Sequence, residues 1–429
     1  MARAIPVRGA PNSRTRPRLR VPALAFLLSL LVLLSPDLTL APLNAVEPNS
    51  SIASSTADPV RTPSRPGPLR PIDVDAGTIR RAAPRPPVES VASAPASVAD
   101  PAVSAAIEAA RAYGEAYGVT CAAVRDGALL WSGASGRYRD GITPVGGEDS
   151  LVVGSVMKTF VSAAVLQLAE EGRLGLDDPV VRHLPRETSV TPDITIRQLL
   201  DHTSGLADVF NDTTKTGIET DPGHAWGARE LLATIHAPWY RPGEGYAYAN
   251  TNYYLLGLVI ERITGHTLAD ELDHRFFGPL GLDTARLLTG APGEPLEPAW
   301  ATIFWASGAM SASAADLARW GDALYGDVIL TPESRTAMLT TKNAENYGLG
   351  VQRIEVPGAA GYGHTGMLKT YTSLLLYLPQ QNVTISLLVN RTHVDLAGML
   401  AARPPGGGPS LLELAGVTLP PPAPPTLTP

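Results

Sequence analysis

The feature that most constrains this chain is a change in composition near residue 100. Residues 46–100 are dense in Pro, Ser, Ala and Arg and contain almost no aromatic side chains. Such a stretch buries too little apolar surface to offset the entropy lost on ordering, which predicts a disordered linker. Residues 401–429 repeat this character in RPPGGGP and PPPAPP, which predicts a Pro-rich tail. A hydrophobic core is therefore expected only within residues 101–400, a length that one compact domain can have.

The first 45 residues have the layout of a signal peptide. Arginines at positions 14, 16, 18 and 20 precede an apolar run over residues 21–34, and Ala45 offers a cleavage point. The run is shorter than the ~20 residues that a membrane-spanning helix requires. We therefore expect residues 1–45 to be removed and the protein to be secreted, to the cell envelope or beyond it. An uncleaved N-terminal anchor is the alternative, and it is the only membrane association that the sequence suggests.

Charge and cysteine usage exclude several classes of partner. The net charge is −7 and the isoelectric point is near 5.7, so no basic surface for nucleic acid is expected. The single cysteine, Cys121, lies in an apolar run, where a thiol behaves as a small buried hydrophobe. A disulfide within the chain and a cysteine-based metal site are both excluded.

Apolar periodicity predicts strands at both ends of the domain and helices between them. A hairpin is expected over residues 119–124 and 129–132, with its turn at Asp126-Gly127, and two further strands over residues 372–378 and 383–388. A strongly apolar helix is expected over residues 155–171, and others at residues 101–117, 196–200, 228–236, 252–264, 268–277 and 314–325. This order indicates one antiparallel sheet closed by the two chain ends, with a helical insertion.

The first candidate for chemistry is the SxxK tetrad formed by Ser155 and Lys158 at the start of the apolar helix. Residues three apart lie on one helix face, so a serine nucleophile and a lysine that activates it can meet there. Only four of the 34 basic residues are lysines, and a lysine, unlike arginine, is able to lose its proton when it is buried. The alternative is a lysine that merely extends from the helix to solvent.

Two later motifs add polar groups that suit the same reaction. Tyr248 and Asn250 follow a Gly-rich turn, where a phenol can shuttle a proton if nearby cations lower its pKa, and an amide can orient a substrate. His364-Thr365-Gly366 precedes an apolar strand, and the backbone N–H of Met367 can face an oxyanion. Packing and turn formation are the alternative roles of these residues.

Ser155-Val156-Met157-Lys158, Tyr248-Ala249-Asn250 and His364-Thr365-Gly366, in this order, resemble the serine β-lactamase and DD-peptidase superfamily. The segments LLDHTSGL, FFGPLGLDT and SGAMSASAADLARW are similar to its class C branch, and the likeness extends over nearly all of residues 101–395. The resemblance implies a mixed α and β fold, in which a five-stranded antiparallel sheet packed with helices lies beside an all-helical subdomain.

The resemblance also implies roles for individual residues. Ser155 would be acylated, and Lys158 and Tyr248 would handle its proton. The N–H groups of Ser155 and Met367 would form the oxyanion hole. The residues that border the substrate would be Asn250, His364, Thr365, Gly366 and Met367. No metal or organic cofactor is implied.

The sequence departs from the family pattern at the third motif. His364 stands where efficient class C β-lactamases carry lysine, and Thr370 stands where many relatives place glycine. A literal Lys215-Thr216-Gly217 lies in a polar stretch before the tyrosine motif, and we interpret it as a loop. We interpret the remaining histidines, including His202, as structural.

These features predict an exported serine hydrolase that works through an acyl-enzyme on Ser155. The leading hypothesis is a D-alanyl-D-alanine carboxypeptidase-like, penicillin-binding peptidase, because an exported enzyme on a long linker would meet the cell wall. An esterase or a weak class C-type β-lactamase would use the same acyl-enzyme. A non-catalytic protein that binds β-lactams or wall peptides is the alternative from another class. Each hypothesis predicts a small-molecule or peptide ligand, namely a D-alanyl peptide, a β-lactam or an ester.

Overall fold

The computed structural model describes residues 100–184, 193–341 and 345–421. The expected signal peptide and all but the last residue of the expected linker lie outside the described residues, as do the last eight residues of the expected tail. Within the described ranges, no helix combines the length and the apolar character that crossing a membrane requires.

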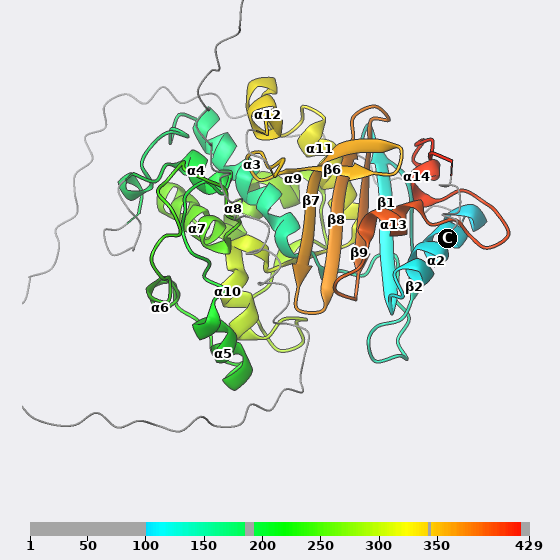
Figure 1. Ribbon diagram of the computed structural model, residues 1–429, viewed down its shortest axis with the longest axis horizontal. Helices are drawn as coiled ribbons and strands as arrows, with labels where there is room; N and C mark the ends of the chain where they lie inside the picture. Colours follow the sequence, from blue (N-terminus) through cyan, green and yellow to red (C-terminus); the bar gives the residue numbers. More distant parts are fainter. Residues whose placement is uncertain (1–99, 185–192, 342–344, 422–429) are drawn as a thin grey trace, which may run out of the picture. The chain divides into compact units, whose positions relative to one another are not determined.

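A six-stranded antiparallel sheet forms the centre of the fold, in the order β2-β1-β9-β8-β7-β6 (Figure 1). The strands are β1 (Gly118–Arg125), β2 (Ala128–Gly136), β6 (Gln352–Val356), β7 (Ala359–Leu368), β8 (Tyr371–Leu378) and β9 (Val383–Val389). Because β1 pairs with β9, strands from the two ends of the domain lie side by side, as expected. The mixed α and β fold is confirmed, and the sheet has six strands where five were expected.

Alternating side chains of β1 divide the interior into two cores. Val119, Cys121 and Ala123 face a core that is shared with α2 (Pro101–Tyr113), whereas Ala122 and Val124 face the larger core. This alternation follows from the two-residue period of a strand that is covered on both faces. The larger core is shared with α11 (Ala314–Tyr325), which contacts β1, β8 and β9.

Two helices near the chain end complete the smaller core. They are α13 (Leu396–Ala401) and α14 (Leu411–Leu414), and both pack beside α2 (Figure 1). Leu411 and Leu412 are fully buried there. The expected Pro-rich tail, residues 401–429, therefore contains a helix, α14, that packs as part of the domain.

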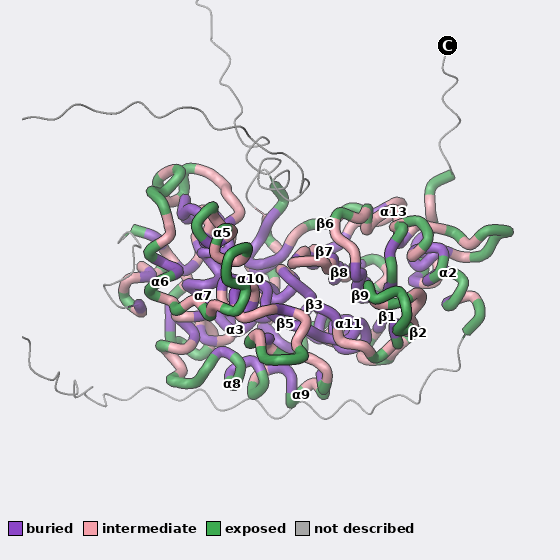
Figure 2. Tube along the Cα trace, turned by 90° about the horizontal axis from the view of Figure 1, so that it is seen from below, coloured by how far each residue is buried: buried purple, intermediate pink, exposed green. Residues whose placement is uncertain are grey.

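The helical part of the domain surrounds α3 (Met157–Glu170), which is buried on nearly every side, as its composition predicts. In Figure 2 the buried residues, in purple, lie both in this helical part and in the strands of the sheet. The surrounding helices are α4 (Ile196–Leu200), α5 (Asp212–Thr220), α6 (Ala228–Ala233), α7 (Asn250–Thr264), α8 (Leu268–Leu272), α9 (Gly278–Leu280), α10 (Pro298–Gly308) and α12 (Pro332–Leu339). A small three-stranded sheet consists of β3 (Leu151–Val152), β5 (Met310–Ala312) and β4 (Arg286–Leu287), and its strand β3 contacts β8 and β9 of the main sheet.

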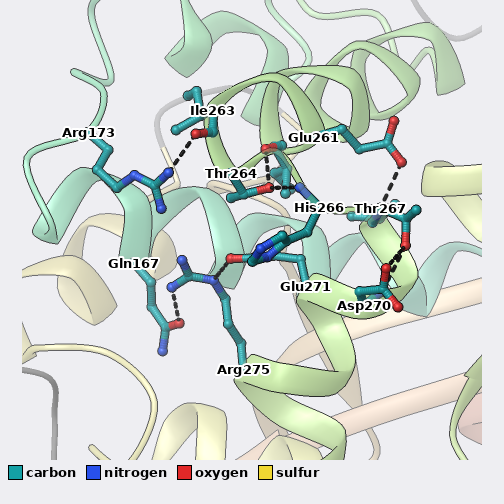
Figure 3. A network of polar contacts seen from close by, with 12 residues as sticks. Gln167, Arg173, Glu261, Ile263, Thr264, His266, Thr267, Asp270, Glu271 and Arg275 are labelled. Atoms are coloured by element: carbon teal, nitrogen blue, oxygen red, sulfur yellow. Dashed lines mark hydrogen bonds and ion pairs between the residues drawn. The ribbon is translucent and has the colours of Figure 1, made fainter.

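A network of polar contacts joins the end of α3 to the segments that follow α7 (Figure 3). Arg275 Nε donates to Glu271 Oε1 at 2.6 Å, and Arg275 Nη1 donates to Gln167 Oε1 on α3 at 3.0 Å. His266 Nδ1 lies 3.0 Å from the second oxygen of Glu271. Glu271 is almost fully buried, and a buried carboxylate requires such partners. The network therefore fixes the end of α3 that lies away from Ser155.

Candidate active site

Ser155 lies in η1 (Gly154–Val156), the turn that connects β3 to α3. Gly154 has φ +53° and leaves no room for a side chain, because a Cβ there would lie 2.9 Å from the backbone nitrogen of Met367. Glycine therefore allows the serine turn to approach strand β7 closely. This approach brings the backbone of Ser155 next to the end of the HTG motif.

Lys158 lies one helical turn beyond Ser155 and is fully buried. Its Nζ is 3.0 Å from Ser155 Oγ, and it donates to Asn250 Oδ1 at 2.9 Å and to the carbonyl of Ser307 at 2.6 Å. Burial lowers the pKa of Lys158 to about 7, although the charge of Asp208 acts in the opposite direction. A substantial fraction of this lysine is therefore neutral at neutral pH and able to accept the proton of Ser155.

The carbonyl of Ser307 reaches Lys158 because α10 is kinked just before it. The backbone of Trp305 is non-helical, with φ 4° and ψ −104°. The following residues turn toward Lys158, and Gly308 packs against the backbone of Gly154. Ser307 thereby supplies a fixed acceptor to the amine. No motif in the sequence indicated this contact.

Asn250 links Lys158 to a second residue that the sequence analysis missed, Asp208. Asn250 Oδ1 accepts from Lys158, while Asn250 Nδ2 donates to Asp208 Oδ2 at 3.1 Å. Asp208 Oδ1 also accepts from the backbone nitrogens of Asn250 at 3.1 Å and Phe210 at 3.0 Å. Burial raises the pKa of Asp208, against the effect of these donors and of Lys158. The amide is therefore held in one orientation between an amine and a carboxyl group.

Tyr248 lies beside the same lysine. Lys158 Nζ is 4.9 Å from the centre of the Tyr248 ring. The centre of the His202 ring lies 4.2 Å from the centre of the Tyr248 ring. The Tyr248 hydroxyl oxygen is buried, and no described residue forms a well-aligned hydrogen bond with it. Burial raises the pKa of Tyr248 well above its ordinary value, and the neighbouring Ser155 hydroxyl offsets this only in part. Tyr248 is therefore protonated at neutral pH, and the lowered pKa on which its role as a proton shuttle was made conditional is not found.

His202 holds the segment that carries Tyr248. Its Nδ1 accepts from the backbone nitrogen of Ala249 at 3.3 Å and lies 2.8 Å from Asn252 Nδ2. Burial and the nearby charge of Lys158 lower the pKa of His202 well below its ordinary value. A neutral ring with its proton on Nε2 fits these two donors. The structure places this histidine directly behind the Tyr248 ring.

His364 is buried and neutral. Its Nε2 lies 2.9 Å from Tyr347 Oη, and its Nδ1 lies 2.5 Å from the carbonyl oxygen of Thr365. This carbonyl can only accept, so Nδ1 carries the proton and Nε2 accepts from Tyr347. Burial and the charge of Lys158 lower the pKa of His364 to about 3. The third motif therefore brings no positive charge to the site at neutral pH.

Thr365, Gly366 and Met367 form the strand edge beside Ser155. A Cβ on Gly366 would lie 2.1 Å from the carbonyl of Val153 and 3.1 Å from the backbone nitrogen of Ser155, so only glycine fits. The Thr365 N–H points away from β8, because it donates to Gln352 Oε1 at 2.9 Å. Residues two apart in a strand present their N–H groups to the same side, so the Met367 N–H shares this edge. Donors from Ser155 and Met367 therefore lie close enough to serve one oxyanion.

The structure brings all eight candidate residues around one point, with Lys158 and Asn250 in direct contact and Tyr248 beside them. Asp208, Tyr347 and Gln352 join them from segments without a recognised motif, and Ser307 joins them from the start of the segment SGAMSASAADLARW, to which no role was assigned. Asp208 alone left a signal, as an acidic residue inside the apolar stretch GLADVF. Among the described residues, no cluster of three or more His, Cys, Asp or Glu could hold a metal ion.

The second KTG sequence does not take part in this arrangement. Lys215, Thr216 and Gly217 lie within helix α5, so their interpretation as a loop is wrong. Asn211 caps the N-terminus of this helix, because its side chain accepts from the backbone nitrogens of Thr213 and Thr214. Such an N-cap stabilises a helix even where the composition is polar. Lys215 Nζ lies 5.1 Å from the centre of the Phe210 ring rather than at Ser155.

Comparison with known proteins identifies the family. The Beta-lactamase family model matches residues 103–403. A D-aminopeptidase of Cereibacter sphaeroides is 28% identical over 317 residues, which cover 67% of this chain and 60% of the relative. The chain thus spans less than two thirds of that relative's length.

Solved structures share the fold. A D-stereospecific amidohydrolase from Streptomyces sp. has a TM-score of 0.59 and 28% identity, covering 68% of this chain and 94% of that one. The octameric penicillin-binding protein homologue from Pyrococcus abyssi has a TM-score of 0.55 and 23% identity, covering 69% of this chain and 74% of that one. This likeness concerns the fold alone. These matches do not specify a branch, so class C membership stays a prediction. The chain belongs to the beta-lactamase family of serine hydrolases.

Proposed function

We propose that this protein hydrolyses amides and short peptides whose acyl group is a D-amino acid, through an acyl-enzyme on Ser155. The relatives named above, a D-aminopeptidase and a D-stereospecific amidohydrolase, support this substrate class. The contacts around Lys158 support the acyl-enzyme. The expected carboxypeptidase is the second candidate.

In the proposed reaction, neutral Lys158 removes the proton of Ser155 as the serine oxygen bonds to the substrate carbonyl carbon. The N–H groups of Ser155 and Met367 stabilise the oxyanion. Tyr248, protonated because it is buried, donates its proton to the departing amine and regains one from Lys158. Water then attacks the acyl carbon and releases the D-amino acid. Asn250, His364, Thr365 and Gly366 border the substrate in this arrangement.

The observation that carries the proposal is the neutral His364. A carboxypeptidase substrate ends in a carboxylate, and a carboxylate removed from water requires a nearby cation or several donors. His364 supplies no charge, because it is buried and donates its only N–H to the chain itself. A substrate whose leaving group is ammonia or a neutral arylamine needs no such cation. The site therefore favours amide substrates over peptides with a free C-terminus.

The test compares substrates that differ in one feature. Residues 46–429 and the Ser155→Ala variant are incubated with D-alanine p-nitroanilide, its L-enantiomer, a D-alanyl-D-alanine peptide with a blocked N-terminus, and p-nitrophenyl acetate. We expect hydrolysis of the D-anilide by the parent alone, with an added acyl mass on the protein. Preference for the L-enantiomer, or release of free D-alanine from the blocked peptide as the faster reaction, would contradict the proposal.

The same experiment separates the other hypotheses. Turnover of the acetate ester without the anilide would indicate an esterase. A chromogenic cephalosporin is added to the same series, and a higher kcat/KM for it than for the anilide would indicate a β-lactamase. Binding of any of these compounds without an adduct on Ser155 would indicate a non-catalytic protein.

We propose further that the protein is exported. The support is the sequence alone, namely the arginines and the apolar run within residues 1–34. The N-terminal sequence of the protein recovered from the culture medium and from the envelope fraction tests this. A start near residue 46 would support cleavage, and recovery of the intact chain from the cytosol would contradict export.

A further inference from the structure

Gln352, the first residue of β6, makes an unusual pair of contacts with Thr365. A single oxygen, Gln352 Oε1, accepts from the Thr365 backbone nitrogen at 2.9 Å and from Thr365 Oγ1 at 3.1 Å. In the sheet Gln352 lies opposite Gly363, where the pairing of β6 with β7 ends. The side chain therefore extends past the last paired residue and covers the next two donors of the strand edge.

These donors belong to the edge that faces the nucleophile. Thr365 lies two residues before Met367, and the two N–H groups point to the same side of the strand. Gly366, between them, is in contact with the backbone of Ser155. An acyl group bound to Ser155 would therefore place its neighbouring atoms along Thr365.

An N–H and an O–H that converge on one oxygen form a receptor for an acceptor atom. A carboxylate oxygen of a ligand would suit it best, because charged acceptors make stronger hydrogen bonds than neutral ones. A neutral amide oxygen from the chain itself occupies the receptor here. His364, the adjacent residue, adds no charge that would help a carboxylate to displace it.

We propose that Gln352 is a specificity-determining residue that occupies the acceptor position at Thr365 and so excludes substrates with a carboxylate at that position. This inference rests on the proposed function in taking Ser155 as the nucleophile, and it narrows the substrate class to compounds that are neutral on the Thr365 side. A carboxylate-bearing ligand must first break both contacts to Gln352, which slows its acylation of the enzyme.

The test uses two ligands that differ only in the charge of one group, benzylpenicillin and its methyl ester. The rate at which each acylates Ser155 is measured by intact-mass spectrometry for the parent and for Gln352→Ala. The variant frees both donors of Thr365. We expect the ratio of the benzylpenicillin rate to the ester rate to rise about tenfold, the effect of one to two net hydrogen bonds.

Two further variants keep the test decisive. Gln352→Glu retains the side-chain length and both acceptor contacts but adds a negative charge, and it should lower the same ratio below that of the parent. Gln381→Ala, in the turn between β8 and β9, removes a glutamine away from Ser155 and should leave the ratio unchanged. If Gln352→Ala fails to fold, the fall in Gln352→Glu alone supports the inference, and an unchanged ratio there overturns it.

The outcomes distinguish this inference from the proposed function. Equal acceleration of both ligands in Gln352→Ala, or no acylation by benzylpenicillin in that variant, would show that Gln352 only caps the end of β6, and would overturn the inference. Hydrolysis of D-alanine p-nitroanilide by the parent is a separate measurement that reports on the proposed function. Either proposal can therefore fail while the other stands.

Discussion

At the scale of single residues, the activity is expected to depend most on the titratable amine of Lys158. Lys158→Arg keeps the positive charge but cannot release a proton, so Ser155 loses its base. We expect acylation to slow by about 10²–10⁴-fold, the usual contribution of a general base. The measurement is the rate of adduct formation on Ser155, with thermal unfolding of both proteins as the control. A variant that stays folded and reacts at a near-normal rate would refute the role of Lys158.

Asp208 is expected to set the pH at which this base becomes available. Its negative charge raises the pKa of Lys158 and so opposes the effect of burial. Asp208→Asn removes that charge, so the pKa of Lys158 falls and the neutral amine persists to lower pH. The acidic limb of the kcat/KM profile should therefore move toward lower pH. An unchanged limb, or one displaced toward higher pH, would show that Asp208 does not act through Lys158.

The residues found from the sequence and those missed differ in how they reach the site. Ser155 and Lys158 are neighbours on one helix, so their spacing alone predicts that they meet. Ser307 reaches Lys158 through a kink in α10, and Gln352 reaches Thr365 across the end of a strand pair. Such contacts depend on tertiary packing and leave no local pattern. The protonation states of His364 and Tyr248 were missed because burial, which sets them, is not visible in a motif.

At the scale of elements, helix bounds were predicted correctly where a capping residue marks the start of the helix. Helices α4 and α11 have the predicted bounds, and each begins after a residue that caps it, Thr195 and Ser313 respectively. Helix α5 was missed because its polar sequence lacks an apolar period, although Asn211 caps it. Helix α14 was missed because one buried turn between Pro-rich stretches resembles a tail. Its pairing with α2 is a long-range contact.

Helix α14 gives a prediction about stability that is independent of the active site. Leu412 is fully buried in the smaller core, beside α2 and α13. Leu412→Ala should lower the free energy of unfolding by about 2–4 kcal/mol, the usual cost of such a cavity. Urea denaturation measures this change, and the less buried Leu414→Ala serves as the matched control with a smaller loss. Since the smaller core lies across the sheet from Ser155, kcat should stay the same in both variants.

An unfolding free energy that is equal for Leu412→Ala and for the parent would show that α14 does not contribute to the fold. A loss of kcat in a fully folded Leu412→Ala protein would instead show that the two cores are coupled through the sheet. The second result would contradict the division of the interior that the alternation in β1 indicates.

At the scale of the whole molecule, burying three bases makes stability depend on pH. The pKa of Lys158 falls to about 7 and that of His364 to about 3, and the pKa of His202 is also lowered. For each group, between its pKa in the folded protein and its ordinary pKa, the unfolded chain is protonated and the folded protein is not. The free energy of unfolding therefore rises with pH in that range. Each group contributes up to about 1.4 kcal/mol per pH unit within its own range. Asp208, whose pKa is raised, acts in the opposite direction in acid.

The ranges of these groups separate their effects. The histidines destabilise the fold as the pH falls below their ordinary pKa of 6.5. Burial of Lys158 destabilises the fold less and less as the pH rises from 7 to its ordinary pKa of 10.5, because the unfolded lysine loses its proton over that range. Urea denaturation at pH 5, 7 and 9 should therefore give a free energy of unfolding that increases at each step. In Lys158→Met, the free energy of unfolding should no longer increase between pH 7 and 9 but should still increase between pH 5 and 7. Carboxylates with lowered pKa values, such as Glu108, titrate below this window. A parent that is equally stable at pH 7 and 9 would show that Lys158 is charged in the folded protein, and the base proposed for Ser155 would then be absent.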